Sequence, residues 1–172
     1  MTLDEIVDEF RECNYAHFDY FYNETKKGVF FSICAIINDN DVIDDLMQDT
    51  YVKFLENIDK YQSKTNIKAF LSRISHNIAI NYYNKEKKMV HDEEIFDYIP
   101  EETNKTPYSE IRVVEMLKCL DDISREIVIQ HVINELKFKD IAKIVDKPLG
   151  TVLWLYNKAM KELKRKVGGE DE

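Results

Sequence analysis

The sequence contains little of what breaks or cross-links a protein chain. Among its 172 residues are only four glycines, three prolines and three cysteines. So few glycines and prolines favour long helices over a hairpin-rich β fold. Cys13, Cys34 and Cys119 are odd in number and far apart, which indicates free thiols in a reducing compartment and argues against a disulfide framework.

Membrane and export signals are also missing. No run of apolar residues approaches the length of a membrane span. The first six residues, Met1 to Ile6, include two carboxylates, whereas a secretory signal begins with positive charge. We therefore expect a cytoplasmic protein with no direct insertion into a membrane.

The usual signatures of an enzyme are absent from the sequence. The four histidines, His17, His76, His91 and His131, are dispersed, and the cysteines do not have the spacing of metal ligands. There is no glycine-rich phosphate loop and no nucleophile motif. We expect no cofactor, no metal and no catalytic residue, although a nuclease built on the acidic cluster described below stays an alternative.

What the chain does contain is apolar residues in quantity and charge in blocks. Hydrophobic residues make up 44% of the sequence, enough for packed cores, and the net charge is −9. Residues 62–90 hold six basic and one acidic side chain, and residues 137–167 hold nine and three. Residues 1–61 and 91–110 are strongly acidic. Two basic blocks in an acidic chain point to local binding surfaces, with randomly charged, solvated helix faces as the alternative.

Apolar residues recur at spacings of three and four along most of the chain, which predicts an all-α fold. The stretch from Met89 to Glu110 lacks that period, is acidic and contains Pro100 and Pro107, which is typical of a linker. We predict two small helical domains, residues 1–90 and 111–172, joined by residues 91–110. The predicted helices cover residues 4–22, 22–37, 41–58, 67–88, 111–120 and 126–136, followed by a pair between 136 and 166.

The helix over residues 41–58 has one apolar and one acidic side. Ile43, Leu46, Met47, Tyr51 and Phe54 lie on a single stripe. Carboxylates repel DNA phosphates, so the opposite side should face a protein or water, and a basic helical partner would suit it. That opposite side carries Asp41, Asp44, Asp45, Gln48, Asp49 and Glu56.

The helix over residues 67–88 combines amides, cations and aromatic rings on its polar side. Amides read base edges, cations bind phosphates and aromatic rings stack on exposed bases, so this mixture suits single-stranded or partly melted nucleic acid. An ordinary amphipathic helix with a basic end is the alternative, and Tyr82 could equally be core. The candidate residues, with the preceding polar loop, are Lys64, Asn66, Arg73, His76, Asn77, Asn81, Lys85, Lys87 and Lys88.

The C-terminal pair is predicted to be a helix-turn-helix. Asp146 to Pro148 form the turn, and Pro148 suits the start of a helix, where its missing N–H costs nothing. In such a pair the second helix reaches base edges while lysines bind phosphates. A helical hairpin within a bundle is the alternative. The residues expected to face DNA are Lys139, Lys147, Thr151, Trp154, Tyr156, Asn157, Lys158 and Lys161.

The order of these motifs resembles a bacterial sigma factor. Residues 43–51 (Ile-Asp-Asp-Leu-Met-Gln-Asp-Thr-Tyr) and 67–81 are similar to sigma region 2. Residues 120–128 and 136–163, with Gly150-Thr-Val152 and Lys158-Ala159, are similar to region 4. From about Tyr22 to Lys166 the chain resembles an extracytoplasmic-function sigma factor, which keeps only these two domains and a linker.

The resemblance implies partners and residue roles. The partners are core RNA polymerase, through its β′ clamp and β flap, promoter DNA and an anti-sigma factor. Asp45, Gln48 and Asp49, with Asp44 beside them, match the positions that dock on the β′ clamp. Arg73 and Asn77 match the helix that opens the −10 promoter element, and the loop from Lys64 to Asn66 matches one that captures a flipped base. Thr151, Trp154 and Lys158 lie on the helix that reads the −35 element.

Several residues depart from the family pattern. Asn81 and Asn84 stand where Asp and Arg are common, and Leu153 and Leu155 stand where Lys or Arg is frequent. Asp121 replaces a usual Pro. Because fewer phosphates would be neutralised, we expect weak affinity for DNA in the absence of polymerase.

A second interpretation makes the chain a plain DNA-binding regulator. It would read DNA with the C-terminal helix-turn-helix, and its N-terminal helices would dimerise or sense a signal. This interpretation accounts for residues 137–167 but leaves the basic, amide-rich helix at 67–88 without a role.

Overall fold

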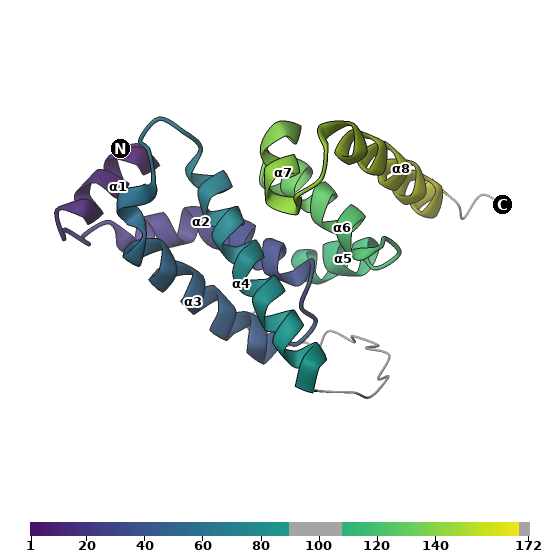
Figure 1. The fold of residues 1–172 in the computed structure, drawn as a ribbon, viewed down its shortest axis with the longest axis horizontal. Coiled ribbons are helices and arrows are strands. Elements are labelled where there is room, and N and C mark those ends of the chain that lie inside the picture. Colours follow the sequence, from purple (N-terminus) through teal and green to yellow (C-terminus); the bar gives the residue numbers. More distant parts are fainter. Residues whose placement is uncertain (90–107, 169–172) are drawn as a thin grey trace.

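The computed structural model describes residues 1–89 and 108–168, and they are helical almost throughout (Figure 1). The helices gather into an N-terminal group on the left of Figure 1 and a C-terminal group on the right. The all-α prediction is confirmed. The predicted linker, residues 91–110, lies mostly outside the described residues. The elements are α1 (Leu3–Arg11), α2 (Phe18–Cys34), α3 (Asn40–Glu56), η1 (Ile58–Lys60), α4 (Ile67–Met89), α5 (Tyr108–Leu117), α6 (Asp122–Val128), η2 (Ile129–Ile133), α7 (Phe138–Val145) and α8 (Leu149–Gly168).

The first predicted helix, residues 4–22, is wrong in its extent, because the chain turns after α1. Cys13 has a φ of 61°, a left-handed conformation that no helix continues through. The turn lets the ring of Phe10 meet that of Phe21 edge-on, with centroids 5.3 Å apart. Apolar residues keep a helical spacing on both sides of the turn, so the sequence pattern gave no sign of a break. The break is explained instead by this aromatic packing.

α3 and α4 complete the N-terminal core as their apolar stripes predict. Ile43, Leu46 and Phe54 of α3 are buried, and the ring of Phe54 stacks on that of Phe21 at 5.3 Å. Tyr51 is buried as well, and its hydroxyl is hydrogen-bonded to Thr25 of α2 at 2.8 Å. The acidic side of α3 and the polar side of α4 are left at the surface.

The first two C-terminal helices begin at residues that differ from the prediction. α5 starts at Tyr108 instead of residue 111, and α6 starts at Asp122 instead of residue 126. Asp121, which stands where a Pro is usual, caps α6 by accepting a hydrogen bond from Ser124 N at 2.8 Å. After Val128 the helix widens into the π-helical turn η2, a rare element that often marks functional sites.

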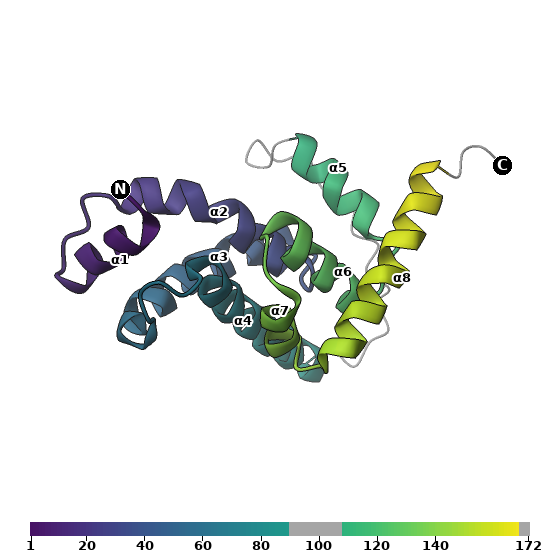
Figure 2. The ribbon, with the colours of Figure 1, turned by 90° about the horizontal axis from the view of Figure 1, so that it is seen from above.

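The N-terminal and C-terminal groups of helices, which correspond to the two predicted domains, pack directly against each other. Phe31 of α2 and Ala35, which directly follows that helix, are completely buried, and they belong to the same apolar cluster as Leu117, Ile129 and Ala159 of the C-terminal domain. η2 lies against α2, and α7 lies against the start of α4. Seen from above, α2 runs from α1 towards the C-terminal helices, in line with this contact (Figure 2).

Candidate protein and nucleic-acid interfaces

An acidic groove of about 780 Å³ runs along α3. Asp41, Asp44, Asp45 and Gln48 line one side of it. Its floor is apolar and aromatic, formed by Phe18, Tyr22, Met47, Tyr51, Val52 and Leu55. The sequence predicted the carboxylates but not the rings from α2, which only the fold brings beside them.

The chemistry of this acidic groove suits a basic, partly apolar helix from another protein. Asp45, Gln48 and Asp49 are exposed on one side of α3, and Val52 is 55% exposed one turn further on. Carboxylates around an apolar floor attract lysines and arginines and offer a surface for their aliphatic stems. The same carboxylates repel phosphates, so the groove is unsuited to nucleic acid.

The polar face of α4 is exposed along most of its length. Arg73, Asn77, Asn81, Lys85 and Lys87 all lie at the surface. The side chain of Lys88 lies outside the described residues. Tyr83 is 40% exposed, whereas Tyr82 is half-buried against the N-terminal core, and this burial raises the pKa of its hydroxyl.

One candidate residue of α4 is engaged elsewhere. The Nδ1 atom of His76 is hydrogen-bonded to Oε1 of Glu126, which is buried in α6 of the C-terminal domain. In this arrangement His76 contacts the neighbouring domain instead of presenting its ring to solvent.

The polar loop before α4 is anchored at its beginning and its end. The Tyr61 carbonyl accepts a hydrogen bond from the guanidinium of Arg11 in α1, and the Tyr61 hydroxyl donates to Asp4. At the other end, Asn66 Oδ1 accepts hydrogen bonds from Lys68 N at 3.0 Å and Ala69 N at 3.3 Å, which caps α4. Lys64, between the two anchors, is exposed and has a φ of 70°.

Replacing Asn66 with alanine should destabilise the protein by about 1 kcal/mol, because the first N–H groups of α4 lose their acceptor. For a protein of this size the melting temperature should fall by roughly 3 °C. Asn66→Asp, which keeps a capping oxygen, is the matched control and should melt close to the wild type. Equal loss of stability in both variants would show that the cap is not the cause.

The C-terminal pair has the predicted tight turn. α7 ends at Val145, Asp146 adopts a left-handed conformation with a φ of 54°, and α8 begins at Leu149. Val152 and Ala159 lie on the buried side of α8. The opposite side is exposed and carries Thr151, Trp154, Asn157, Lys158 and Lys161, and Lys139 and Lys147 are exposed on and beside α7.

One residue predicted to face a partner is part of the core instead. The ring of Tyr156 lies 5.0 Å from that of Phe138 and 4.9 Å from that of His131. Leu155, a departure from the family pattern, also packs on the C-terminal core. On the exposed side, the ammonium of Lys158 sits 5.1 Å from the centre of the Trp154 ring, which pre-orders both side chains.

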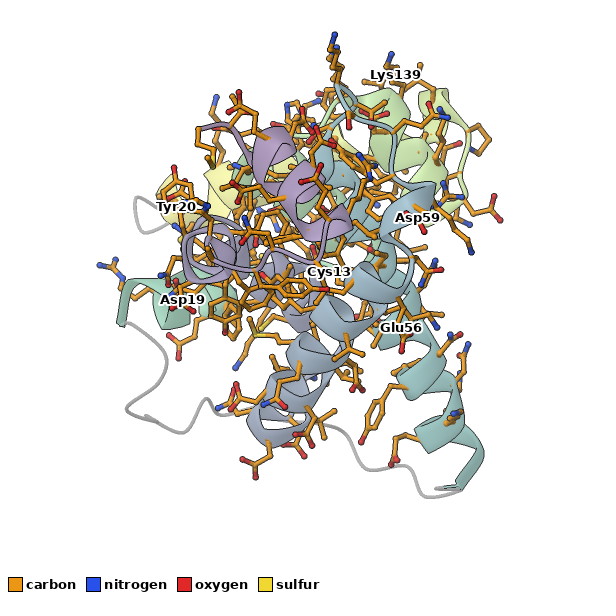
Figure 3. The ribbon with its side chains drawn as sticks, turned by 90° about the vertical axis from the view of Figure 1, so that its left-hand side faces the viewer. Cys13, Asp19, Tyr20, Glu56, Asp59 and Lys139 are labelled. Carbon is orange, nitrogen blue, oxygen red and sulfur yellow. The ribbon has the colours of Figure 1, made fainter. Side chains whose placement is uncertain are left out.

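The domain junction brings together cations that the sequence did not group. A groove of about 980 Å³ lies between the loop before α4 and the start of α7, and Asp140 is its one acidic lining residue. Lys139 marks its C-terminal side at the top of Figure 3. Lys60, Lys137 and Lys143 were not among the candidates, because no periodicity signals a contact between two domains. The cations lining this junction groove are Lys60, Lys64, Lys68, Arg73, Lys137, Lys139 and Lys143.

Residues 1–89 and 108–168 contain neither a candidate metal site nor a candidate membrane span. Within them, no three His, Cys, Asp or Glu side chains come together in a way that could bind a metal ion. None of the helices in the same ranges has both the length and the apolar composition to cross a membrane.

Comparison with known proteins finds similarity to bacterial sigma factors. Residues 22–89 match the family model of sigma-70 region 2. The RNA polymerase sigma factor YlaC of Bacillus subtilis (strain 168) is 29% identical over 130 residues, which cover 70% of this chain and 75% of that protein. The ECF RNA polymerase sigma factor EcfG of Rhodopseudomonas palustris (strain TIE-1) is 29% identical over 128 residues, which cover 72% and 70%.

A solved structure supports the fold over most of the chain. The sigma factor RpoE of Bartonella quintana, in complex with the anti-sigma factor NepR, superposes with a TM-score of 0.72 at 20% sequence identity. The superposition covers 88% of this chain and 96% of that one, so it includes helices of both domains.

Proposed function

Because the chain is a sigma factor of the extracytoplasmic-function type, we propose that it starts transcription through three separate faces. The acidic groove on α3 binds core RNA polymerase, α4 and its loop bind the −10 element, and α8 reads the −35 element. The observation that carries this proposal is the separation of charge: carboxylates line α3, while amides and cations cover α4 and α8.

The acidic groove is the face proposed for the β′ clamp of polymerase. Asp44, Asp45, Gln48 and Asp49 supply the polar contacts, and the aromatic floor supplies apolar area at the centre. A central apolar patch with charged groups around it is the usual anatomy of a specific protein interface.

α4 and the preceding loop are proposed to bind the opened −10 strand. Opening DNA costs stacking energy, and enclosing an extruded base recovers part of that cost. Asn77 and Asn81 have the amides to read base edges, Arg73 and Lys85 have the charge to hold phosphates, and Tyr83 offers a ring for stacking. Lys64 and Asn66 border the place for the extruded base.

α7 and α8 are proposed to act as the helix-turn-helix that reads the −35 duplex. Trp154 and Asn157 face outward for base contacts, and Lys158 and Lys161 face outward for phosphates. Leu153 is 38% exposed where the family often carries a cation. This leaves fewer phosphate contacts and a weaker grip on duplex DNA when polymerase is absent.

Lys158→Ala should weaken binding to −35 duplexes by a similar factor whatever their sequence, because a phosphate contact carries no sequence information. The slope of log K against log salt should fall by about one. Lys53→Ala, which removes an exposed lysine from α3, is the control and should leave both quantities unchanged. Loss of affinity for one sequence alone would instead place Lys158 on a base.

The remaining parts of the proposal concern the setting of the protein. It works in the cytoplasm, contacts the β flap as well as the β′ clamp, carries no catalytic residue and needs no cofactor. The domain boundaries we propose are residues 1–90 and 111–172. An anti-sigma factor that covers the acidic groove and the DNA-binding faces would silence it.

Run-off transcription with purified core polymerase tests the proposed function. A sigma factor gives core polymerase the ability to start RNA at defined sites, whereas a plain DNA-binding regulator does not. Sequencing the 5′ ends should show starts downstream of one shared pair of promoter elements. Starts no more frequent or better defined than those of core polymerase alone would reject the function.

A further inference from the structure

A group of buried polar side chains joins the two domains, and we define it as the interdomain latch. Asn134, which follows η2, directs its Nδ2 atom at Ser32 Oγ of α2 (3.1 Å), Ser72 Oγ of α4 (3.2 Å) and the Gly28 carbonyl (3.4 Å). His76 binds Glu126 across the same boundary. The latch consists of the side chains of Ser32, Ser72, His76, Glu126, Gln130 and Asn134 and the backbone of Gly28.

The two amides of the latch belong to the π-helical turn and its end. Gln130 lies within η2 and Asn134 directly follows it, and Asn134 Nδ2 donates to Gln130 Oε1 at 2.7 Å. Gln130 Nε2 in turn donates to Ser32 Oγ at 3.1 Å. All three residues are at most 3% exposed, so the network is fully desolvated and each polar group depends on its partners.

Gly28 allows the domains to approach this closely. A Cβ atom at this position would lie 2.3 Å from Oδ1 of Asn134, which is closer than real Cβ contacts come, and 3.2 Å from its Cγ. Gly28 lies inside the helix α2, where glycine is normally unfavourable compared with alanine. All the atoms found close to an added Cβ at Gly28 belong to Asn134 of the other domain. The N-terminal fold by itself therefore does not require glycine here, whereas the contact between the domains does.

Arg125 adds a further link beside the latch. Its guanidinium donates to Ala35 O of the N-terminal domain at 3.1 Å and to Leu117 O and Leu120 O of its own domain. The boundary therefore combines polar groups with the apolar contact of Phe31. Polar content of this kind is typical of domain interfaces that open and close.

With its domains docked, the protein is smaller than the distance between the two promoter elements. A compact chain of this length has a radius of gyration of about 16 Å, and hence a diameter of roughly 40 Å. The −10 and −35 elements are centred about 25 base pairs apart, or roughly 85 Å along B-form DNA at about 3.4 Å per step. Simultaneous reading of both elements therefore requires the domains to separate.

We propose that the interdomain latch keeps the free sigma factor docked and inactive, and that initiation requires it to open. The docked state leaves the acidic groove accessible while it ties His76 of the −10 face to Glu126. The seven cations of the junction groove, contributed by both domains, oppose docking through their mutual repulsion. Polymerase and DNA can then compete with the latch without first unfolding either domain.

The native cysteines allow the latch to be tested in the full chain. Cys13 of the N-terminal domain and Cys119 of the C-terminal domain are exposed and accept spin labels. Cys34 is buried, and this burial together with the charge of Glu110 raises the pKa of its thiol, which protects it from labelling. Pulsed electron paramagnetic resonance then measures the distance between the two domains.

Gly28→Ala is the informative variant, because alanine favours the helix but excludes Asn134. The wild type should show one short, narrow distance population, and Gly28→Ala a longer and broader one. Gly150→Ala, a helical glycine with no atom within 4 Å of its added Cβ, is the matched control and should match the wild type. Asn134→Ala and the double variant complete a cycle in which the two changes should not add. An unchanged distance in Gly28→Ala, or a broad distribution in the wild type, would overturn the latch.

Binding to promoter DNA with a pre-opened −10 element tests whether the latch inhibits. If nine-tenths of the free protein is docked, Gly28→Ala should bind DNA that carries both elements about tenfold more tightly. Binding to a −35 duplex alone should not change. A longer distance without a gain in affinity would overturn the inhibitory role. The proposal assumes the sigma function, but the distance measurement does not, so failure of run-off transcription with the expected distances would reject the function and leave the docking contact standing.

Discussion

Replacing Asp45 and Asp49 together with lysine should abolish capture of core RNA polymerase. Both side chains are exposed on α3, where Asp45 lines the acidic groove and Asp49 follows one helical turn later. The double change adds four units of positive charge to a surface proposed to bind a basic partner. Like charges brought together at an interface cost several kcal/mol, and each 1.4 kcal/mol weakens binding tenfold. We expect at least a hundredfold loss of affinity, measured by titrating labelled protein with core enzyme.

A matched control distinguishes the effect of charges at the groove from the effect of the protein's net charge on binding. Glu12 and Asp59 are exposed carboxylates of the N-terminal domain that do not line the acidic groove, and Asp59 is visible in Figure 3. Glu12→Lys with Asp59→Lys makes the same change in net charge and should leave affinity within about twofold, as expected for a distant, screened charge. If both double variants lost affinity equally, bulk charge and not the groove would govern docking.

Asn77→Ala should slow promoter opening by tenfold to a hundredfold and leave binding to a −35 duplex unchanged. Asn77 is exposed midway along α4, between Arg73 and Asn81 on the same face. A bidentate amide contact to a base is worth about 1–3 kcal/mol, and here it would form only once the base is extruded. Permanganate reactivity of unpaired thymines reports opening, and a gel shift on the −35 duplex reports the other domain.

The same substitution elsewhere provides the comparison. Asn23 is an exposed asparagine on α2, and Asn23→Ala should open promoters at the wild-type rate. Both changes favour the helix, so a difference between them cannot come from helix propensity. A defect of Asn77→Ala that appeared equally in −35 binding would count against its place on the −10 element.

The parts of the fold that depend on one helix could be predicted from the sequence. The stripe of α3 and the turn at Asp146 follow from local spacing and turn chemistry, and the structure has both. The exposed acids of α3 and the exposed cations of α8 follow from the same stripes, because a residue opposite a buried side chain faces solvent.

The parts that depend on contacts between helices could not be predicted. The turn at Cys13 is set by the rings of Phe10 and Phe21, and Tyr156 is drawn into the core by Phe138 and His131. Tertiary packing overrode a continuous helical period in the first case and an apparently free helix face in the second.

The interdomain latch had no signal in the sequence at all. Gln130 and Asn134 are polar residues that periodicity assigns to the surface, yet both are buried by the other domain. Both residues lie at the π-helical turn, which breaks the 3.6-residue period on which the prediction rested. Gly28 similarly looks like an ordinary weak point of α2 until its distance to Asn134 is known.

Photocrosslinking within a complete promoter complex tests the central claim, that carboxylates bind polymerase and amides and lysines bind DNA. A photoreactive amino acid replaces Gln48 in the acidic groove in one protein and Trp154 on α8 in another. We predict that position 48 crosslinks to a polymerase subunit and not to DNA, and that position 154 crosslinks to the −35 duplex. Crosslinks from position 48 to the promoter, or from position 154 to polymerase alone, would contradict the account.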